Sequence, residues 1–210
     1  MNRQHLSDRL DRVYGSTDRA DLEAAYDEWA DSYDMEVSRL GYLLRSVSTG
    51  YISRFIPFNA RVLDAGAGTG LIGGYLKAMG FNNLTAIDLS ERMLQHARTR
   101  GCYRELRRMA LGEALDFPND AFDHGYAVGV FTEGHAPPES FDEIIRVIRP
   151  GGCFVFSIRD DVYRHRGYRE RQDQLENDGR WSQLAASPIF QPYPDSKPSV
   201  QSRVFVYQAS

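Results

Sequence analysis

A glycine-rich segment is the first place in this chain where residue types and spacing predict chemistry. It runs from Asp64 to Gly73 as DAGAGTGLIG and includes the end of a short apolar run, 61–65. Glycines let the backbone turn sharply and lie close to a ligand. The amide groups at the start of the helix that follows attract polar or negative groups. The segment therefore predicts a ligand-binding loop between a strand and a helix.

Two classes of ligand fit this loop. The spacing from Gly68 to Gly73 is the dinucleotide fingerprint G-x-G-x-x-G. Gly66, Gly68 and Gly70 behind Asp64 match a loop that binds S-adenosylmethionine (SAM) instead. A carboxylate at position 64 repels a pyrophosphate but can hold the cationic amino group of SAM, directly or through water. A nicotinamide oxidoreductase also needs a substrate domain, for which 210 residues leave little chain. The sequence favours SAM and keeps the dinucleotide as the alternative.

A second carboxylate, Asp88, ends the next apolar run, 84–88. In a doubly wound sheet, ligands bind at the carboxyl ends of the strands. We therefore expect Asp88 to bind both ribose hydroxyls of a nucleoside. Taken alone, Asp64 could be an ordinary strand-end carboxylate and Asp88 the cap of the next helix. Together with the glycines, at this spacing, the two carboxylates favour a binding site.

Candidates for acid–base chemistry follow a further apolar run, 123–130. Glu133 and His135 lie just beyond it. We prefer His135, because an unshifted histidine pKa suits a general base near neutral pH; a loop histidine that only bonds the backbone is the alternative. Phe131, Arg159 and Tyr163 are expected to contact the acceptor. For Arg159 and Tyr163, a solvated start of a helix is the alternative.

The elements that must position these residues alternate along the chain. Apolar periodicity and turn residues predict strands at 61–65, 84–88, 107–111, 123–130, 153–158 and 201–207. They predict helices at 20–32, 37–55, 71–79, 90–99, 137–148 and 163–184. This alternation is typical of a doubly wound, mostly parallel α/β sheet with helices on both faces. Residues 1–57 are expected to form a helical lead-in, and 58–210 the binding core of the same single domain.

Four segments together resemble the successive motifs of class I SAM-dependent methyltransferases. They read VLDAGAGTG from Val62, IDLS from Ile87, FPNDAFD from Phe117 and RPGG from Arg149. The segment YDEWADSYD from Tyr26 resembles the lead helix of the same family. Residues 128–135, VGVFTEGH, are more closely similar to the methyltransferase-like group of the Williams–Beuren syndrome region and its bacterial relatives.

The resemblance implies a fold and a set of residue roles. The fold is a Rossmann-like sheet of seven strands, mostly parallel with the last strand antiparallel, and the N-terminal helices act as a lid. The glycine loop, with Thr69, lines the methionine part of SAM, and Val128 lies beside it. Asp88 binds the ribose. Four further side chains pack on the adenine or close over the cofactor: Leu89, Met93, Trp29 and Tyr33.

The chain departs from this family at one position. Many relatives carry an acidic residue after the third strand that accepts a hydrogen bond from the adenine amino group. Here the matching residue is Leu111, which has no such acceptor. The resemblance therefore implies that backbone groups of Leu111 and Gly112, with Glu113 beyond them, hold the adenine.

Composition narrows the function further. The net charge of −4 does not favour binding to nucleic acid. No apolar run approaches the ~20 residues of a membrane span, so we expect no membrane association. The two cysteines lie at no metal-ligand spacing, which predicts no metal site and a reducing cytoplasm.

We therefore expect a cytoplasmic SAM-dependent methyltransferase, monomeric or homodimeric. It would act on a small-molecule acceptor by in-line methyl transfer and release S-adenosylhomocysteine (SAH). Two alternatives share the same loop motif. One is a protein that binds SAM or SAH without transfer, and the other is an enzyme of this fold with non-methyl chemistry such as cyclisation. The sequence does not indicate the acceptor atom.

Overall fold

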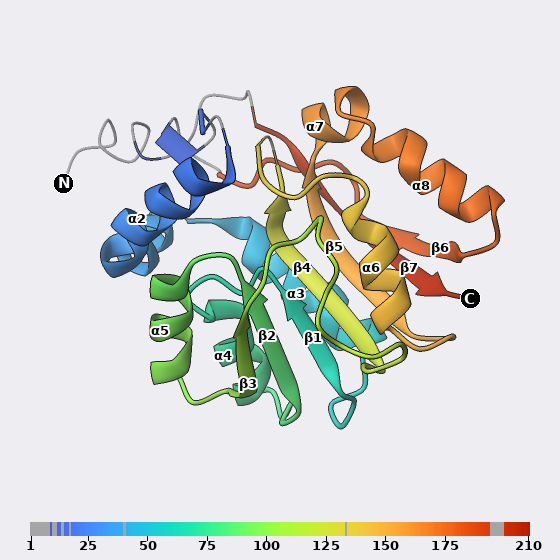
Figure 1. The fold of residues 1–210 in the computed structure, drawn as a ribbon, viewed down its shortest axis with the longest axis horizontal. Helices are drawn as coiled ribbons and strands as arrows, with labels where there is room; N and C mark the ends of the chain where they lie inside the picture. The colour runs from blue at the N-terminus through green and yellow to red at the C-terminus, as the bar shows by residue number, and fades with distance from the viewer. Residues whose placement is uncertain are drawn as a thin grey trace.

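The computed structural model describes residues 9, 12–13, 15–16, 18–39, 41–132, 134–193 and 200–210. These residues form a central sheet with helices on both faces (Figure 1). The elements follow one another as α2 (Arg19–Arg39), α3 (Leu43–Phe55), β1 (Val62–Ala65), α4 (Leu71–Ala78), β2 (Leu84–Asp88), α5 (Glu91–Thr99), β3 (Tyr103–Arg108), β4 (His124–Phe131), α6 (Ser140–Val147), β5 (Cys153–Arg159), α7 (Asp160–His165), α8 (Tyr168–Asn177), β6 (Trp181–Ala186) and β7 (Ser202–Ala209).

The sheet has seven strands in the order β3-β2-β1-β4-β5-β7-β6. Strands β1 to β5 pair in parallel, whereas β7 is antiparallel to both of its neighbours. The predicted α/β sheet, mostly parallel with an antiparallel last strand, is confirmed. The chain order reverses beside β1, where β2 lies on one side and β4 on the other. At such a point the loops that follow β1 and β4 separate and leave room for a ligand.

Strand β1 explains how the sheet is held between two helical layers. All four of its residues are buried, as expected of a parallel strand that is covered on both faces. Val62 packs in one apolar cluster with Ile52 of α3 and Leu76 of α4. Leu63 packs in the other cluster, with Phe141 of α6. Alternate residues of one strand thus fix helices on opposite faces.

The N-terminal helix is longer than its sequence pattern predicts. A break was expected between 32 and 37, but α2 continues from Arg19 to Arg39. Glu36 and Val37 are buried on the same helix face as Trp29, and the indole nitrogen of Trp29 donates to Glu36 Oε2 at 2.9 Å. The helix has ended by Gly41, whose φ is 61°. Helix α2 lies beside α5 in Figure 1, above the carboxyl ends of β1 and β2.

Three other expectations are wrong in detail. Strand β3 covers Tyr103–Arg108 and not 107–111; it is an exposed edge strand with little apolar pattern. The helix expected over 163–184 is two helices, α7 and α8, separated by Gly167 at φ 79°. Its last part is the unpredicted strand β6, which follows Gly179 and buries Trp181 against Tyr207.

No helix among the described residues is long and apolar enough to cross a bilayer. Whether residues up to 57 move as a lid stays a prediction.

Candidate functional site

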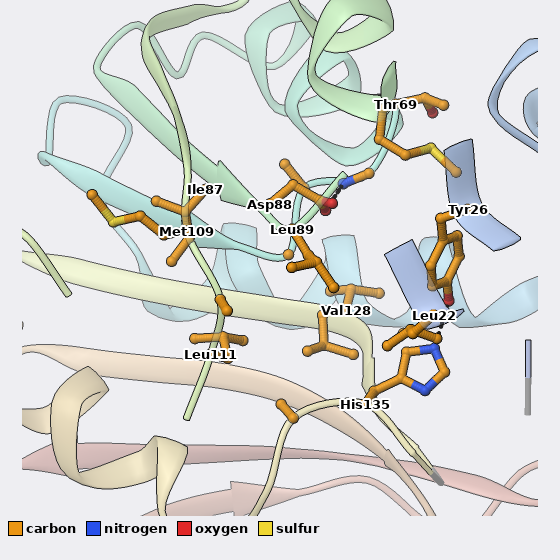
Figure 2. Close-up of a pocket in the computed structure, with 18 of the residues that line it drawn as sticks. Leu22, Tyr26, Thr69, Ile87, Asp88, Leu89, Met109, Leu111, Val128 and His135 are labelled. Atoms are coloured by element: carbon orange, nitrogen blue, oxygen red, sulfur yellow. Dashed lines mark hydrogen bonds between the residues drawn. The ribbon is translucent and has the colours of Figure 1, made fainter. Parts of the chain in front are cut away.

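A cavity of about 400 Å³ lies at the carboxyl ends of β1, β2 and β4 and is covered by α2. Figure 2 shows its two ends. Ile87, Met109 and Leu111 gather at one end, and Tyr26 lies beside His135 at the other. Asp88, Leu89 and Val128 lie between them. The predicted site residues that line the cavity are Tyr33, Gly66, Gly68, Thr69, Asp88, Leu89, Met93, Leu111, Gly112, Val128 and His135.

The loop after β1 needs glycine where it approaches β4 most closely. Gly66 has a φ of 89°, and a Cβ there would lie 2.3 Å from Cγ2 of Val130. Its amide donates to the carbonyl oxygen of Ile87 at 2.8 Å. At Gly68 the space beside the backbone is open, and the residue lines the cavity. The loop therefore lies where the sequence predicts it, with its backbone facing the cavity.

Asp88 connects this loop to the end of β2. Its Oδ2 accepts a hydrogen bond from the Gly68 amide at 2.7 Å, and its Oδ1 accepts one from the Ser90 amide at 2.9 Å. Burial raises the pKa of Asp88, and the bonds from these amides oppose the rise. The cap of α5 is Ser90, whose hydroxyl accepts from the Met93 amide. Asp88 is thus a cavity carboxylate, suited to a diol, and does not cap the helix.

Asp64 does not reach the cavity, contrary to the expectation from the sequence. It faces the α3 and α4 layer, because residues alternate along β1, and it is only 2% exposed. Its Oδ2 accepts from the hydroxyls of Tyr103 at 2.5 Å and Tyr126 at 2.6 Å. Burial raises the pKa of Asp64 to about 7, against the effect of the two tyrosines. The Asp64 carboxylate thus joins β1, directly before the glycine loop, to β3 and β4.

Gly73, the last glycine of the dinucleotide spacing, makes this arrangement possible. A Cβ there would lie 2.3 Å from the hydroxyl oxygen of Tyr103. Gly70, at φ 79°, faces Tyr103 and Ala97 and does not line the cavity. Both glycines are thus explained by the packing of a tyrosine under the loop, and neither requires a pyrophosphate.

The end of the cavity around Leu111 is an apolar slot. Leu89, Met93, Met109 and Leu111 line it, together with Ala110 and Gly112. Apolar walls of this kind suit a flat ring.

Glu113 does not line this slot. Its carboxylate forms an ion pair with Arg19 at the start of α2.

Helix α2 covers the cavity through a row of polar contacts along one of its faces. Successive turns of the helix present one side chain each to the core: Arg19 to Glu113, Glu23 to Arg108, Asp27 to Ser90, Asp31 to Arg92 and His96, and Asp34 to Thr69 and Arg100. Tyr33 lines the cavity, but Trp29 does not. The Trp29 ring is only 1% exposed and packs edge-on against Tyr33 at 4.8 Å.

His135 and Tyr26 meet at the other end of the cavity. The Nε2 atom of His135 and the Tyr26 hydroxyl lie 2.7 Å apart, and the two rings meet edge-on. Burial, and to a lesser degree the charge of Arg159, lowers the pKa of His135 to about 4. The expected unshifted pKa is therefore wrong, and the imidazole is neutral at pH 7. Glu133, the other predicted acid–base residue, lies outside the described residues.

The three predicted acceptor contacts do not line the main cavity. Phe131 is buried in the aromatic core against Phe141 and Phe156. Arg159 pairs with Asp161 at 2.5 Å and lines a separate cavity of about 30 Å³. Tyr163 packs on Phe205 with 5.2 Å between ring centres. Phe131 and Arg159 end β4 and β5, and Tyr163 lies on α7. Of the three, Arg159 still acts on the cavity through its charge, which helps to lower the pKa of His135.

Several lining residues escaped the sequence prediction. They are Arg19, Leu22, Tyr26, Tyr42, Arg45, Met109 and Pro137, among others. Tyr26 carried a usable signal, because it belongs to the same helical stripe as Trp29. Arg45 carried another, since it is a single charge between the apolar residues Leu44 and Val47. Tyr42 and Pro137 reach the cavity only through the tertiary fold and gave no local signal.

Comparison with known proteins gives this geometry a context. Residues 63–156 match the family model described as "Methyltransferase domain". The human Methyltransferase-like protein 27 is 31% identical over 188 residues, which are 86% of this chain and 76% of that protein. The malonyl-[acyl-carrier protein] O-methyltransferase of Erwinia pyrifoliae is 36% identical over 140 residues, which are 65% of this chain but only 50% of that protein.

Among solved structures, the fold is similar to a TehB-like SAM-dependent methyltransferase from Corynebacterium glutamicum. The TM-score is 0.66 at 17% identity, and the match covers 89% of this chain and 100% of the other. At this identity the likeness supports the fold alone. The match to the family model spans residues 63–156. This range includes the glycine loop, Asp88 and β4, which line the cavity.

Proposed function

Because the chain belongs to the methyltransferase family, whose cofactor is S-adenosylmethionine, we propose that it transfers a methyl group from SAM to a small-molecule acceptor. The observation that carries this proposal is a single cavity with two unlike ends. One end offers a diol-binding carboxylate beside an apolar slot. The other end offers a neutral histidine bonded to a tyrosine.

The residues of the first end fit a SAM molecule. We propose that Asp88 binds the ribose hydroxyls and that Leu89, Met93 and Leu111 enclose the adenine. The adenine edge then bonds to backbone groups near Gly112, because Leu111 has no polar side chain. Gly66, Gly68 and Thr69 would hold the methionine part, beside Val128. The open space next to Gly68 and the close approach at Gly66 support this assignment.

When bound, SAM supplies a methyl group on a positively charged sulfur, which is already activated for displacement. The protein then has to hold the acceptor atom in line and keep water out, so orientation dominates the catalysis. We propose that His135 and Tyr26 position the acceptor by hydrogen bonding. A neutral imidazole accepts a hydrogen bond from an acceptor hydroxyl or amine. With a pKa of about 4, it is a weak base until a ligand changes its surroundings.

A small acceptor fits this site better than a macromolecule. The cavity is covered by α2, whose face is tied to the core by polar contacts at five positions. A covered cavity of this size is typical of small-molecule sites. We propose that α2 acts as the lid of the predicted N-terminal unit, 1–57, and opens for the cofactor and the acceptor.

The test combines binding and transfer. Calorimetry should give micromolar binding of SAM and SAH and no binding of NAD. Incubation with SAM and a panel of small acids, phenols, amines and thiols should yield a product that is heavier by one methylene group. Binding of SAH without transfer to any acceptor would favour the non-catalytic alternative. A product without that mass gain would favour cyclisation or other non-methyl chemistry.

A further inference from the structure

Tyr26 on α2 and His135 in the loop after β4 form a hydrogen-bonded pair in the wall of the main cavity (Figure 2). The Tyr26 hydroxyl oxygen lies 2.7 Å from Nε2 of His135. A neutral imidazole has one nitrogen that donates a hydrogen bond and one that accepts. Because the imidazole is neutral at pH 7 and Nε2 is the nitrogen that meets the hydroxyl, a proton can pass from the phenol to the histidine.

The packing of α2 holds the Tyr26 ring in this place. The ring stacks on Trp29 of the same helix, with 6.4 Å between ring centres and an interplanar angle of 12°. It meets the His135 ring edge-on at 5.5 Å. Asp27, the next residue, accepts a hydrogen bond from the hydroxyl of Ser90, which caps α5. The helical turn that carries Tyr26 is therefore fixed to α5 on one side and to His135 on the other.

The order of these two groups favours Tyr26 as the one that meets a ligand in the cavity. Nε2 of His135 is occupied by the tyrosine hydroxyl. A phenol oxygen can accept a hydrogen bond while its own hydrogen is donated. A ligand hydroxyl that donates to Tyr26 would thus complete a chain of two hydrogen bonds that ends at His135. The chain exists only while α2 covers the cavity, because Tyr26 belongs to that helix.

We infer that Tyr26 relays the proton of an acceptor hydroxyl group to His135 during methyl transfer. The inference rests on the proposed function, since it adds a catalytic residue and an acceptor class to the same cavity. The proton of the acceptor moves to the Tyr26 oxygen as the Tyr26 proton moves to Nε2. Tyr26 therefore ends the step as it began, and His135 becomes an imidazolium.

The atoms and charges of this step balance. The acceptor oxygen forms its bond to the methyl carbon with a lone pair, and the carbon–sulfur bond breaks with its electron pair staying on sulfur. One positive charge is thereby lost from the sulfur and one is gained by the imidazole. Burial and the charge of Arg159 disfavour the imidazolium, so His135 returns its proton to solvent when α2 opens.

The strength of the base indicates the class of acceptor. With a pKa of about 4, His135 is too weak a base to ionise a hydroxyl before transfer. An oxygen that carries both its hydrogen and a new methyl group is a strong acid, and it gives its proton even to a weak base. A methylated amine keeps its proton at neutral pH, and a carboxylate has none to lose. The relay is therefore suited to an alcohol or a phenol.

The first test is the tautomer of His135 in the SAH-loaded protein, read by nitrogen NMR of histidine-labelled protein. His135→Gln identifies the signal. The inference predicts a neutral ring with its hydrogen on Nδ1 and a bare Nε2 that accepts from Tyr26. The Nε2 signal should move in Tyr26→Phe and stay in place in Tyr75→Phe, which alters an exposed tyrosine on α4. A hydrogen on Nε2 would overturn the inference, because the histidine would then donate to the tyrosine and could not take its proton.

The second test adds phenol as a probe, with toluene as the counterpart that lacks the hydroxyl. Phenol, but not toluene, should shift the Nε2 signal of the SAH-loaded natural protein and of Tyr75→Phe. Tyr26→Phe should show no such shift. An equal phenol shift in Tyr26→Phe would mean that the ligand meets the imidazole directly, and no shift in the natural protein would mean that a hydroxyl does not bind there. Either result contradicts the relay.

Transfer to a panel of small acids, phenols, alcohols, amines and thiols gives the third test. Methylation of an alcohol or phenol oxygen is the expected result, and Tyr26→Phe should lower kcat for that acceptor about 100-fold or more with the KM for SAM unchanged. A product methylated only on nitrogen, sulfur or a carboxylate would overturn the acceptor class, and an unchanged kcat would overturn the relay. Failure of the wider proposal looks different, because the natural protein would then not bind SAH at all.

Discussion

The two ends of the cavity are built in different ways. The end where we propose that the nucleoside binds comes from two short stretches of sequence, the loop from Gly66 to Thr69 and the turn at Asp88, which hydrogen-bond to each other directly. The other end, where we propose that the acceptor binds, brings together Tyr26 and His135, which are 109 positions apart. The first end is thus local in sequence, whereas the second is assembled by the tertiary fold.

The largest difference between the two ends should appear in SAH affinity when Asp88 is replaced. Replacing Asp88 with Ala removes the acceptor of the Gly68 amide and the proposed ribose contact. We expect SAH affinity to fall about 100-fold or more, since two hydrogen bonds to a charged group are lost. His135→Gln, at the acceptor end, should change SAH affinity by no more than about threefold. Calorimetry measures both. Equal losses in the two variants would remove the distinction between the ends.

Two adjacent glycines of α4 test whether the third glycine of the loop pattern serves packing. Gly73→Ala places a Cβ against Tyr103 and should lower the free energy of unfolding by about 1–3 kcal/mol. Gly74→Ala is the matched control, because the nearest atom lies 3.8 Å from its Cβ. It should raise that free energy by about 0.5–1 kcal/mol through helix propensity. Denaturant unfolding gives both values, and a stable Gly73→Ala protein would contradict the assignment.

Two buried titratable groups, Asp64 beneath the glycine loop and His135 in the cavity wall, should respond to pH in opposite directions. The pKa of Asp64 is raised from 3.8 to about 7, so its contribution to stability is full below 3.8 and is lost as pH rises through 7. The pKa of His135 is lowered from 6.5 to about 4, so its contribution is present above 6.5 and is lost as pH falls toward 4.

The measurement is the melting temperature between pH 4 and 8 for the natural protein, Asp64→Asn and His135→Gln. Relative to Asp64→Asn, the natural protein should lose stability as pH rises from 4 to 7. Relative to His135→Gln, it should gain stability between pH 4 and 6.5. Three parallel curves would mean that neither group is shifted as described.

The smallest change in stability is expected in helix α2, which covers both ends of the cavity. Exposed ion pairs between α2 and the core are individually weak, so Asp31→Asn should change the melting temperature by about 1 °C or less. The whole row is screened together by salt. Raising the salt concentration from about 50 to 500 mM should therefore increase the SAH dissociation rate a few-fold. Asp173→Asn, on α8, is the control for the single change. A dissociation rate that does not depend on salt would contradict the proposal that ion pairs hold α2 closed over the cavity.

The contrast between the two ends also explains what the sequence could predict. The glycine loop and Asp88 were predictable because strand, turn and helix follow within a few residues. The same local view misplaced Asp64, since the direction of its side chain depends on Tyr103 and Tyr126 from neighbouring strands. It also gave His135 an ordinary pKa, because burial under α2 has no sequence signal.

The errors in predicting helices and strands from the sequence also arise where tertiary contacts decide the structure. Most strands and helices were predicted within a few residues, since their apolar periodicity is strong. Strand β6 was missed because it buries Trp181 and exposes the three residues that follow. Its pairing with β7 is a tertiary feature, and its polar pattern reads as the continuation of α8.

The most direct test of a SAM site joined to an acceptor site is a crystal structure of the SAH complex. We predict ribose hydroxyls within hydrogen-bond distance of Asp88 and adenine between Met93 and Leu111. We also predict that the sulfur of SAH faces the pair Tyr26 and His135. A nucleoside bound elsewhere, or a sulfur that faces away from His135, would contradict the assignment of the two ends.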